Sequence, residues 1–455
     1  MIIINILIGL VGLGLVILVH ETGHFAAAKL FGIDVEAFSI GWGKKLFGIT
    51  RGGTEYRISM IPIGGYCKMK GEQMLRKALE DEQSTIPKEP GSFYGVSPWK
   101  RLGVAVAGPG LNLIFAALVF SVIWFIGFKI HSYESKIILV SEYAAPGVQE
   151  QYAADRAGLE TGDRIIAAGK KRVEHYSDLQ EIIAINGGKT LDFTVTRGER
   201  TLTLPVTLGK DAKTGVGQLG IYAWIEPVVD EVKQGSAAHI AGLMRGAVIT
   251  AADGKPVRHT IDFMRTLSGS PSQITITYER QGASRETVLR IPYGENGEPD
   301  LGFSFAYLTF KTPRLSIFRA AGKGLADVGM TLRLSLKSIG MLFQGINVRE
   351  AVSGPIRITY IIGETASYGF KFGLGGGLAT LFRFLSLLSV AVFVMNLLPI
   401  PALDGGMVVI SVIEGIFKKP LRPKAVYRYQ IVGFTIIIAL VLFTTFNDVF
   451  FLIKR

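Results

Sequence analysis

The chain has 455 residues, of which 49% are hydrophobic, and its formal net charge is +12 at pH 7. Its mean hydropathy of +0.36 is high for a soluble protein, and the apolar residues are gathered into long uncharged stretches. We therefore attribute the excess of Lys and Arg to loops beside a lipid bilayer and expect no nucleic acid partner.

The first uncharged stretch, Ile2–Val19, is long enough to cross the ~30 Å hydrocarbon core of a membrane. The alternative is a cleaved signal peptide, but residues 1–5 carry none of the positive charge that such a peptide needs. At ~1.5 Å per residue, a helix from this start reaches His20 after about 25 Å. The residues that follow the stretch therefore lie near the inner end of a span.

Those residues form the string HETGH at positions 20–24. Two histidines four residues apart lie on one face of a helix, so His20 and His24 can bind one Zn²⁺. Glu21 between them is placed to act as the general base on a metal-bound water. Ionisable side chains inside a span are costly and by default indicate a functional site.

The rest of the chain predicts a β-hairpin and three more spans. Strand-like sequence with glycine pairs occupies Phe38–Met69, and a short charged helix and linker of unassigned function follow. The further uncharged stretches are Leu102–Phe128, Phe384–Leu403 and Gln430–Phe446. Lys and Arg are concentrated between spans one and two and between spans three and four, which predicts that these loops are cytosolic. The two termini and the long segment between spans two and three are then on the outer side.

An internal repeat with an offset of 84 residues occupies the outer segment. The string AGLETGDRI at 157–165 returns at 241–249 as AGLMRGAVI, and strand-like sequence follows each copy. We predict two compact modules that resemble the circularly permuted bacterial PDZ domain. Whether they bind extended peptide ends or act only sterically stays open. Apolar residues spaced by three and four between Leu325 and Phe343 then predict an amphipathic helix, either on the outer membrane surface or packed on the modules.

A catalytic zinc needs a third protein ligand. Glu36 is the nearest downstream acid, but it follows a predicted helix break at Gly32. Asp404, in the string NLLPIPALDGG at 396–406, is the preferred candidate. Prolines and glycines in this string interrupt the third span and let a carboxylate face inward at membrane depth. The alternative is a plain Asp-Gly-Gly turn.

The ordered motifs resemble those of the site-2 proteases, zinc metalloproteases that cut within the membrane, over essentially the whole chain. They are HETGH, SIGWG at 39–43, PIGGY at 62–66, GPGLN at 108–112 and the string around Asp404. The resemblance implies a Zn²⁺ cofactor held by His20, His24 and Asp404, with Glu21 catalytic. It also implies that the substrate-binding residues are Asn396, Pro399, Pro401, Gly41 and Gly43.

The implied fold is a multi-pass α-helical membrane protein with four transmembrane helices, a membrane-associated β-hairpin region and two tandem circularly permuted PDZ domains. The predicted parts are span one (1–31), the β region (32–75), a cytosolic helix and linker (76–100), span two (101–129), the PDZ domains (130–224 and 225–308), a periplasmic amphipathic helical segment (309–375), span three (376–403), a cytosolic loop (404–428) and span four (429–453).

The resemblance further implies that the substrates are single-span membrane proteins already trimmed on the outer side, such as an anti-sigma factor or remnant signal peptides. The expected location is the bacterial inner membrane, with both termini and the PDZ domains periplasmic and the active site toward the cytosol. Two other functions would also use parts of this sequence. A PDZ scaffold with an inactive metal site would not need the complete set of His20, Glu21, His24 and Asp404. A metal transporter usually has inverted repeats of spans, and none is detectable here.

Overall fold

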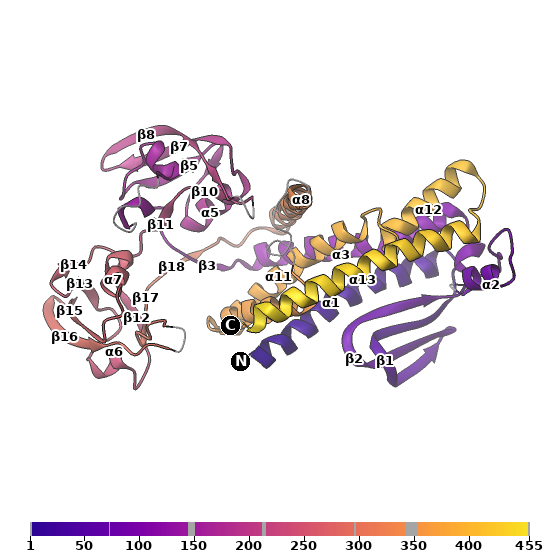
Figure 1. Cartoon of the computed structure of the whole chain (residues 1–455), viewed down its shortest axis with the longest axis horizontal. Coiled ribbons are helices and arrows are strands. Elements are labelled where there is room, and N and C mark those ends of the chain that lie inside the picture. Colours follow the sequence, from indigo (N-terminus) through magenta and orange to yellow (C-terminus); the bar gives the residue numbers. More distant parts are fainter. Residues whose placement is uncertain are drawn as a thin grey trace. The chain divides into compact units, whose positions relative to one another are not determined.

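The computed structural model divides the chain into two compact units, residues 1–128 with 312–455 and residues 129–311 (Figure 1). The structure describes all residues except 1, 72, 144–150, 212–214, 295–296, 343–352 and 454–455.

The first unit is a helical bundle with a β-hairpin at its side (Figure 1). Its helices are α1 (Ile2–Leu30), α2 (Met74–Glu80), α3 (Pro98–Ile126), α8 (Ile317–Leu342), α10 (Pro355–Phe370), α11 (Gly373–Asn396), α12 (Asp404–Phe417) and α13 (Pro423–Ile453). Within the described residues, α1, α3, α11 and α13 are long and apolar enough to cross a membrane. This agrees with the four spans predicted from the sequence.

Local sequence explains where the spans begin and end. Helix α1 stops because Gly32 adopts a φ of +77°, which lets the N–H of Ile33 bond to the carbonyl of Ala28. Helix α3 begins with Ser97, whose side chain accepts from the N–H of Lys100, followed by Pro98 in the first turn. It ends at Gly127, which has a φ of +74°.

The third span ends earlier than predicted. Helix α11 stops at Asn396, because Pro399 and Pro401 cannot supply the backbone donors that a longer helix needs. A tight loop then leads into α12, so the prediction of a cytosolic loop over 404–428 is wrong for its first half. Glycines permit this packing: a Cβ at Gly405 would lie 2.0 Å from the carbonyl oxygen of Leu398. Asp404 is consequently the first residue of a helix.

In its described residues, the predicted amphipathic segment 309–375 contains α8, α10 and the start of α11 rather than a single helix. Val328 and Leu332 of α8 pack against Ala116 and Phe120 of α3, so this helix covers the bundle itself. The predicted positions, on the outer membrane surface or on the modules, stay predictions. Phe343, the last member of the predicted stripe, lies outside the described residues. Helix α10 packs on α1 where a Cβ at Gly363 would meet the carbonyl of Asn5 at 1.8 Å.

The hairpin consists of β1 (Val35–Arg51) and β2 (Thr54–Met69) and bends into a small sheet. The first half of β1 pairs on both sides, with Ser39 opposite Tyr66 on one side and Arg57 on the other. Residues 65–69 therefore form one edge of the sheet, and β2 packs on α1. The bend exposes Trp42 and Phe47, which gives the hairpin an apolar outer surface.

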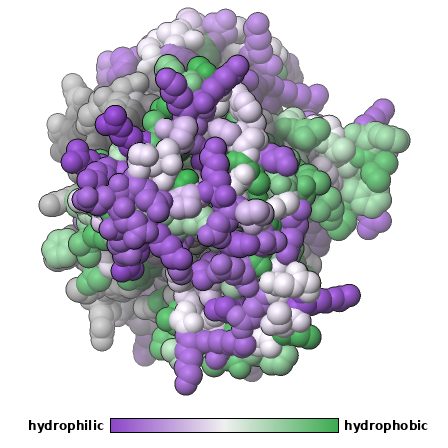
Figure 2. Space-filling view, turned by 90° about the vertical axis from the view of Figure 1, so that its right-hand side faces the viewer, coloured by the Kyte–Doolittle hydropathy of each residue, from purple (hydrophilic) through white to green (hydrophobic). Residues whose placement is uncertain are grey.

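The end of the bundle that carries α2 and the α12–α13 connection differs from its flanks. Hydrophilic side chains gather on this face (Figure 2). Its charged residues include Lys418, Lys419 and Arg422, all exposed. The start of α1 and the end of α13 lie at the opposite end of the bundle (Figure 1).

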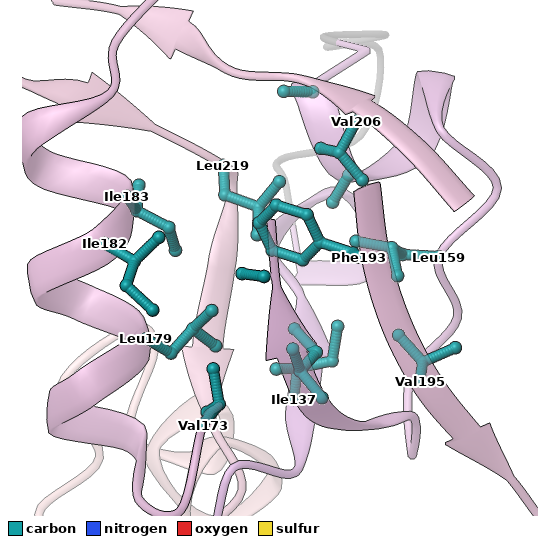
Figure 3. Close-up of a cluster of buried hydrophobic side chains, with 14 of the residues drawn as sticks. Ile137, Leu159, Val173, Leu179, Ile182, Ile183, Phe193, Val195, Val206 and Leu219 are labelled. Carbon is teal, nitrogen blue, oxygen red and sulfur yellow. The ribbon is translucent and has the colours of Figure 1, made fainter. Parts of the chain in front are cut away.

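The second unit contains two modules built in the same way. The first has a four-stranded sheet of order β6-β5-β7-β8 and the second a sheet of order β14-β13-β15-β16. Strand β5 begins at Arg164 and β13 at Val248, 84 residues later, as in the sequence repeat. The circular permutation expected for these modules stays a prediction. Each module has its own core, and Figure 3 shows the first, where Leu179 of α5 and Phe193 of β7 are fully buried.

The elements of this unit are β3 (Lys129–Ser132), β4 (Ile137–Leu139), α4 (Ala153–Arg156), β5 (Arg164–Ala168), β6 (Lys171–Arg172), α5 (Tyr176–Ile185), β7 (Thr190–Arg197), β8 (Arg200–Thr207), β9 (Gly209–Lys210), β10 (Gly217–Gln218), β11 (Ile221–Ala223), β12 (Val229–Val232), α6 (Ala237–Ile240), β13 (Val248–Ala252), β14 (Lys255–Pro256), α7 (Thr260–Thr266), β15 (Gln273–Arg280), β16 (Ala283–Arg290), β17 (Phe303–Phe305) and β18 (Leu308–Lys311). Strands β3 and β18, the first and last strands of this unit, pair with each other in antiparallel fashion.

Candidate metal centre and catalytic cavity

The two histidines of HETGH face one point. Both lie on α1, are less than 10% exposed, and have their Nε2 atoms 3.1 Å apart. The spacing of four residues accounts for this, because it places both side chains on one face of the helix.

Asp404 approaches the same point from the start of α12. Its Oδ2 lies 3.1 Å from Nε2 of His20, and its Oδ1 lies 3.3 Å from Nε2 of His24. Ligand atoms at the usual ~2.1 Å from a tetrahedral zinc are about 3.4 Å from one another. The three side chains therefore offer ligand atoms at separations compatible with one zinc ion. Glu36 instead pairs with Lys68 at 2.6 Å.

The other ring nitrogen of each histidine meets α3. Nδ1 of His24 lies 2.9 Å from the carbonyl oxygen of Val104, and Nδ1 of His20 lies 3.2 Å from Nδ2 of Asn112. Such outer partners fix the orientation of metal-binding histidines. Asn112 belongs to the GPGLN string, to which the sequence assigned no role.

Close packing of α1 on α3 makes these contacts possible. A Cβ at Gly23 would lie 2.2 Å from the carbonyl oxygen of Ala107, and one at Gly108 would lie 2.3 Å from Nε2 of His24. Both positions thus require glycine. Both glycines belong to sequence motifs, but the sequence alone does not indicate which helix each one contacts.

Glu21 lies beside the cluster of His20, His24 and Asp404, in a cavity of about 380 Å³. Its Oε2 accepts a hydrogen bond of 2.9 Å from the backbone N–H of Cys67 in β2. Apolar side chains from β2, α2, residues 93–94, α3 and α12 also line this cavity, together with Gln430 of α13. The edge of the hairpin sheet therefore reaches the predicted catalytic acid.

The residues expected to bind substrate occupy different environments. Asn396 joins the cluster, with its Nδ2 3.4 Å from Nε2 of His20. Pro399 is exposed and Pro401 is buried in the loop before α12, where a Cβ at Gly433 would meet the carbonyl of Pro401 at 2.0 Å. These prolines do not line the described cavity.

Gly41 and Gly43 lie at the bend of β1 and are not among the residues that line the described cavity. Their φ angles are +87° and +89°, a conformation that favours glycine. The bend of the hairpin is sufficient to explain both residues, and their contact with substrate stays a prediction.

Comparison with known proteins identifies the family. The model of "Peptidase family M50" matches residues 8–440. The chain belongs to this family. A candidate zinc metalloprotease of Treponema pallidum is 38% identical over 99% of both chains. The regulator of sigma-E protease RseP of Salmonella typhimurium is 31% identical over 98% of both chains.

The chain is accordingly a metalloendopeptidase, and its cofactor is zinc. Among solved structures, the PDZ domain of an SdrC-like protein from Listeria monocytogenes matches 18% of this chain and 90% of that domain, at 18% identity and a TM-score of 0.17. A likeness of this size does not decide the fold of the two modules.

Proposed function

We propose that this metalloendopeptidase is a site-2 protease that cleaves the transmembrane segments of single-span proteins. One observation carries the proposal: His20 and His24 lie within a helix long and apolar enough to cross a membrane, and Asp404 meets them there. A soluble peptidase would have no reason to keep its ligand cluster in such a helix, since polar groups in a span are costly.

In this proposal His20, His24 and Asp404 hold the zinc. When bound, zinc polarises the scissile carbonyl and lowers the pKa of water toward neutrality. Glu21 takes the proton of the attacking water and passes it to the leaving nitrogen. The N–H of Cys67 holds the Glu21 carboxylate in place for both transfers. Asn396 is positioned to donate to the developing oxyanion or to hold the substrate near the cluster.

The hairpin provides a way to present an extended substrate. Peptide bonds in a transmembrane helix are shielded because every backbone amide is paired, so the substrate must unwind before cleavage. Residues 65–69 form a sheet edge beside Glu21, and an extended chain can add to such an edge by backbone hydrogen bonds. The apolar surface of the hairpin, including Trp42 and Phe47, suits a location within the membrane.

The orientation follows from charge. The hydrophilic end of the bundle, with Lys418, Lys419 and Arg422, lies toward the cytosol under the positive-inside rule (Figure 2). Both termini and the two modules are then periplasmic, and the protein resides in the bacterial inner membrane.

The names of two relatives support a class of substrate. Relatives from Haemophilus influenzae and Salmonella typhimurium carry the names "Regulator of sigma E protease" and "Regulator of sigma-E protease RseP". We infer that this chain cleaves an anti-sigma factor already trimmed on its outer side, in envelope-stress signalling, and also remnant signal peptides. The two modules are PDZ domains, permuted as in bacterial proteases. They act as a size filter that admits a substrate only after its bulky outer domain is removed.

The test is cleavage by the purified full-length chain of a single-span substrate that lacks an outer domain. Mass spectrometry of the fragments is expected to place the cut inside the apolar segment, and a zinc chelator is expected to abolish it. The control is a soluble peptide that contains the same sequence but does not span a membrane. Cleavage only of the soluble peptide, or outside the apolar segment, would contradict the proposal.

A further inference from the structure

Asn112 lies in the middle of α3, and its fully buried amide contacts the outer ring nitrogen of His20. Its Nδ2 faces Nδ1 of His20 at 3.2 Å, while its Oδ1 is buried with no hydrogen-bond partner among the described residues. A buried polar atom without a partner typically costs about 1–3 kcal/mol. This arrangement therefore needs an explanation.

The chemistry of the imidazole supplies one. A neutral histidine whose Nε2 binds a metal carries its proton on Nδ1, which must then donate a hydrogen bond. The NH₂ group of an amide cannot accept that bond. The two ends of an amide differ only in their hydrogen-bonding capacity, and their assignment depends on the surrounding network. A half-turn of the Asn112 amide brings the unpartnered Oδ1 onto Nδ1 of His20.

His24 provides an internal comparison. Its Nδ1 faces the carbonyl oxygen of Val104, an acceptor that is part of the backbone of α3. Asn112 lies eight residues further along α3, about two turns. Each histidine of the cluster thus meets one group of the same helix at its outer nitrogen. Only the group at His20 is a side chain, so only this one can be altered by substitution.

A neighbouring contact keeps this part of α3 in place. The hydroxyl of Ser389 in α11 donates to the backbone carbonyl of Asn112 at 3.1 Å. Ser389 is fully buried, so α3 and α11 are joined at the depth of the cluster. This contact involves the backbone and leaves the amide free to turn.

We propose that Asn112 is a positioning residue that presents Oδ1 to Nδ1–H of His20 and thereby fixes the ring orientation and tautomer in which Nε2 binds zinc. Asn112 is not one of the clustered ligand candidates and acts through His20. Its contribution is expected in the affinity for zinc, where outer-shell partners are typically worth about 10–100-fold. The inference rests on the zinc cofactor and is independent of the substrate class proposed above.

The experiment measures zinc affinity by chelator competition on the full-length protein in detergent, independently of activity. Asn112→Asp keeps an acceptor of nearly the same shape, whereas Asn112→Leu keeps the volume without an acceptor. Asn112→Ala is a second variant without an acceptor that adds no volume, in case the leucine variant does not fold. Ser389→Ala is the control, because it removes a buried hydrogen bond at the same depth and leaves the amide intact.

The aspartate and Ser389→Ala variants are expected to bind zinc within about threefold of the unmodified chain. The folded variant without an acceptor is expected to bind at least tenfold more weakly than the aspartate variant. A difference smaller than tenfold between these two variants would overturn the proposal. It would mean that zinc binding tolerates the loss of the acceptor, or that it depends on a property of Asn112 other than its acceptor oxygen.

Discussion

The carboxylate of Glu21 and the backbone N–H of Cys67 form a hydrogen bond of 2.9 Å between the first span and the edge of the hairpin sheet. This bond joins the two parts of the proposed mechanism, because one partner is the expected general base and the other lies on the strand that would receive the substrate.

Replacement of Glu21 by Gln is expected to lower the cleavage rate by about 10²–10⁴-fold, the usual contribution of a general base. Zinc content is expected to stay at the level of the unmodified chain, since Glu21 is not one of the three clustered ligand candidates. The glutamine oxygen can still accept from Cys67, so the hairpin contact is preserved. Glu36→Gln is the matched control, because Glu36 pairs with Lys68 elsewhere on the hairpin. Equal loss in both variants would contradict a catalytic role for Glu21.

The role of the backbone N–H of Cys67 in holding Glu21 is tested by Cys67→Pro, which removes this donor. Proline is tolerated at sheet edges, where its missing donor faces away from the ladder. The loss of one hydrogen bond of about 1 kcal/mol predicts a several-fold decrease in kcat/KM. The decrease would be larger if Glu21 also lost its orientation. Cys67→Ala keeps the N–H and is expected to cleave normally. Comparable activity of the two variants would show that this backbone donor is unimportant.

Gly108 and Gly110 lie on the same helix and provide a steric test of the metal centre. A Cβ at Gly108 would come within 2.3 Å of Nε2 of His24, whereas a Cβ at Gly110 would have no atom within 4 Å. Overpacking of this kind costs about 1–3 kcal/mol, so Gly108→Ala is expected to weaken zinc binding about tenfold or more. Gly110→Ala is expected to bind zinc normally. Chelator competition measures both, and equal affinities would mean that α1 can move away from α3 without cost.

The size-filter role of the two modules is tested by their deletion. Strands β3 and β18 pair with Ser132 opposite Leu308, so residues 133–307 can be replaced by a short Gly/Ser linker that keeps this pair. The shortened chain is expected to cleave a substrate that still carries its bulky outer domain, which the full chain refuses. The same deletion combined with Glu21→Gln is the control for other proteases. Continued refusal of the untrimmed substrate would exclude a filter in the modules.

The sequence predicted features that depend on local spacing. The interval between His20 and His24 indicated a shared face, and the prolines near Asp404 indicated a break in a span; the structure brings these three residues together. Their role as ligands stays a prediction. The repeat likewise indicated two similar modules, because each copy carries its own turn and strand pattern.

Features that depend on contacts between distant elements were not predicted. The amphipathic stripe of α8 indicated an apolar face but not its partner, which is α3. The partner of Asn112 lies 92 residues away, and nothing in the string GPGLN indicates which atom it faces. Helix α12 was missed because glycines at 405 and 406 resemble a turn, whereas they permit close packing against the preceding loop.

The central claim is that Asp404 completes a zinc site with His20 and His24. The most direct measurement is the zinc content of the purified full-length chain and of Asp404→Asn, by elemental analysis after dialysis against a weak chelator. We predict one zinc per unmodified chain. The Asp404→Asn variant is expected to fold with the same helical content, but its zinc affinity is expected to fall by more than the ~10–100-fold typical of outer-shell changes. A folded Asp404→Asn variant that retains one zinc with unchanged affinity would contradict the claim.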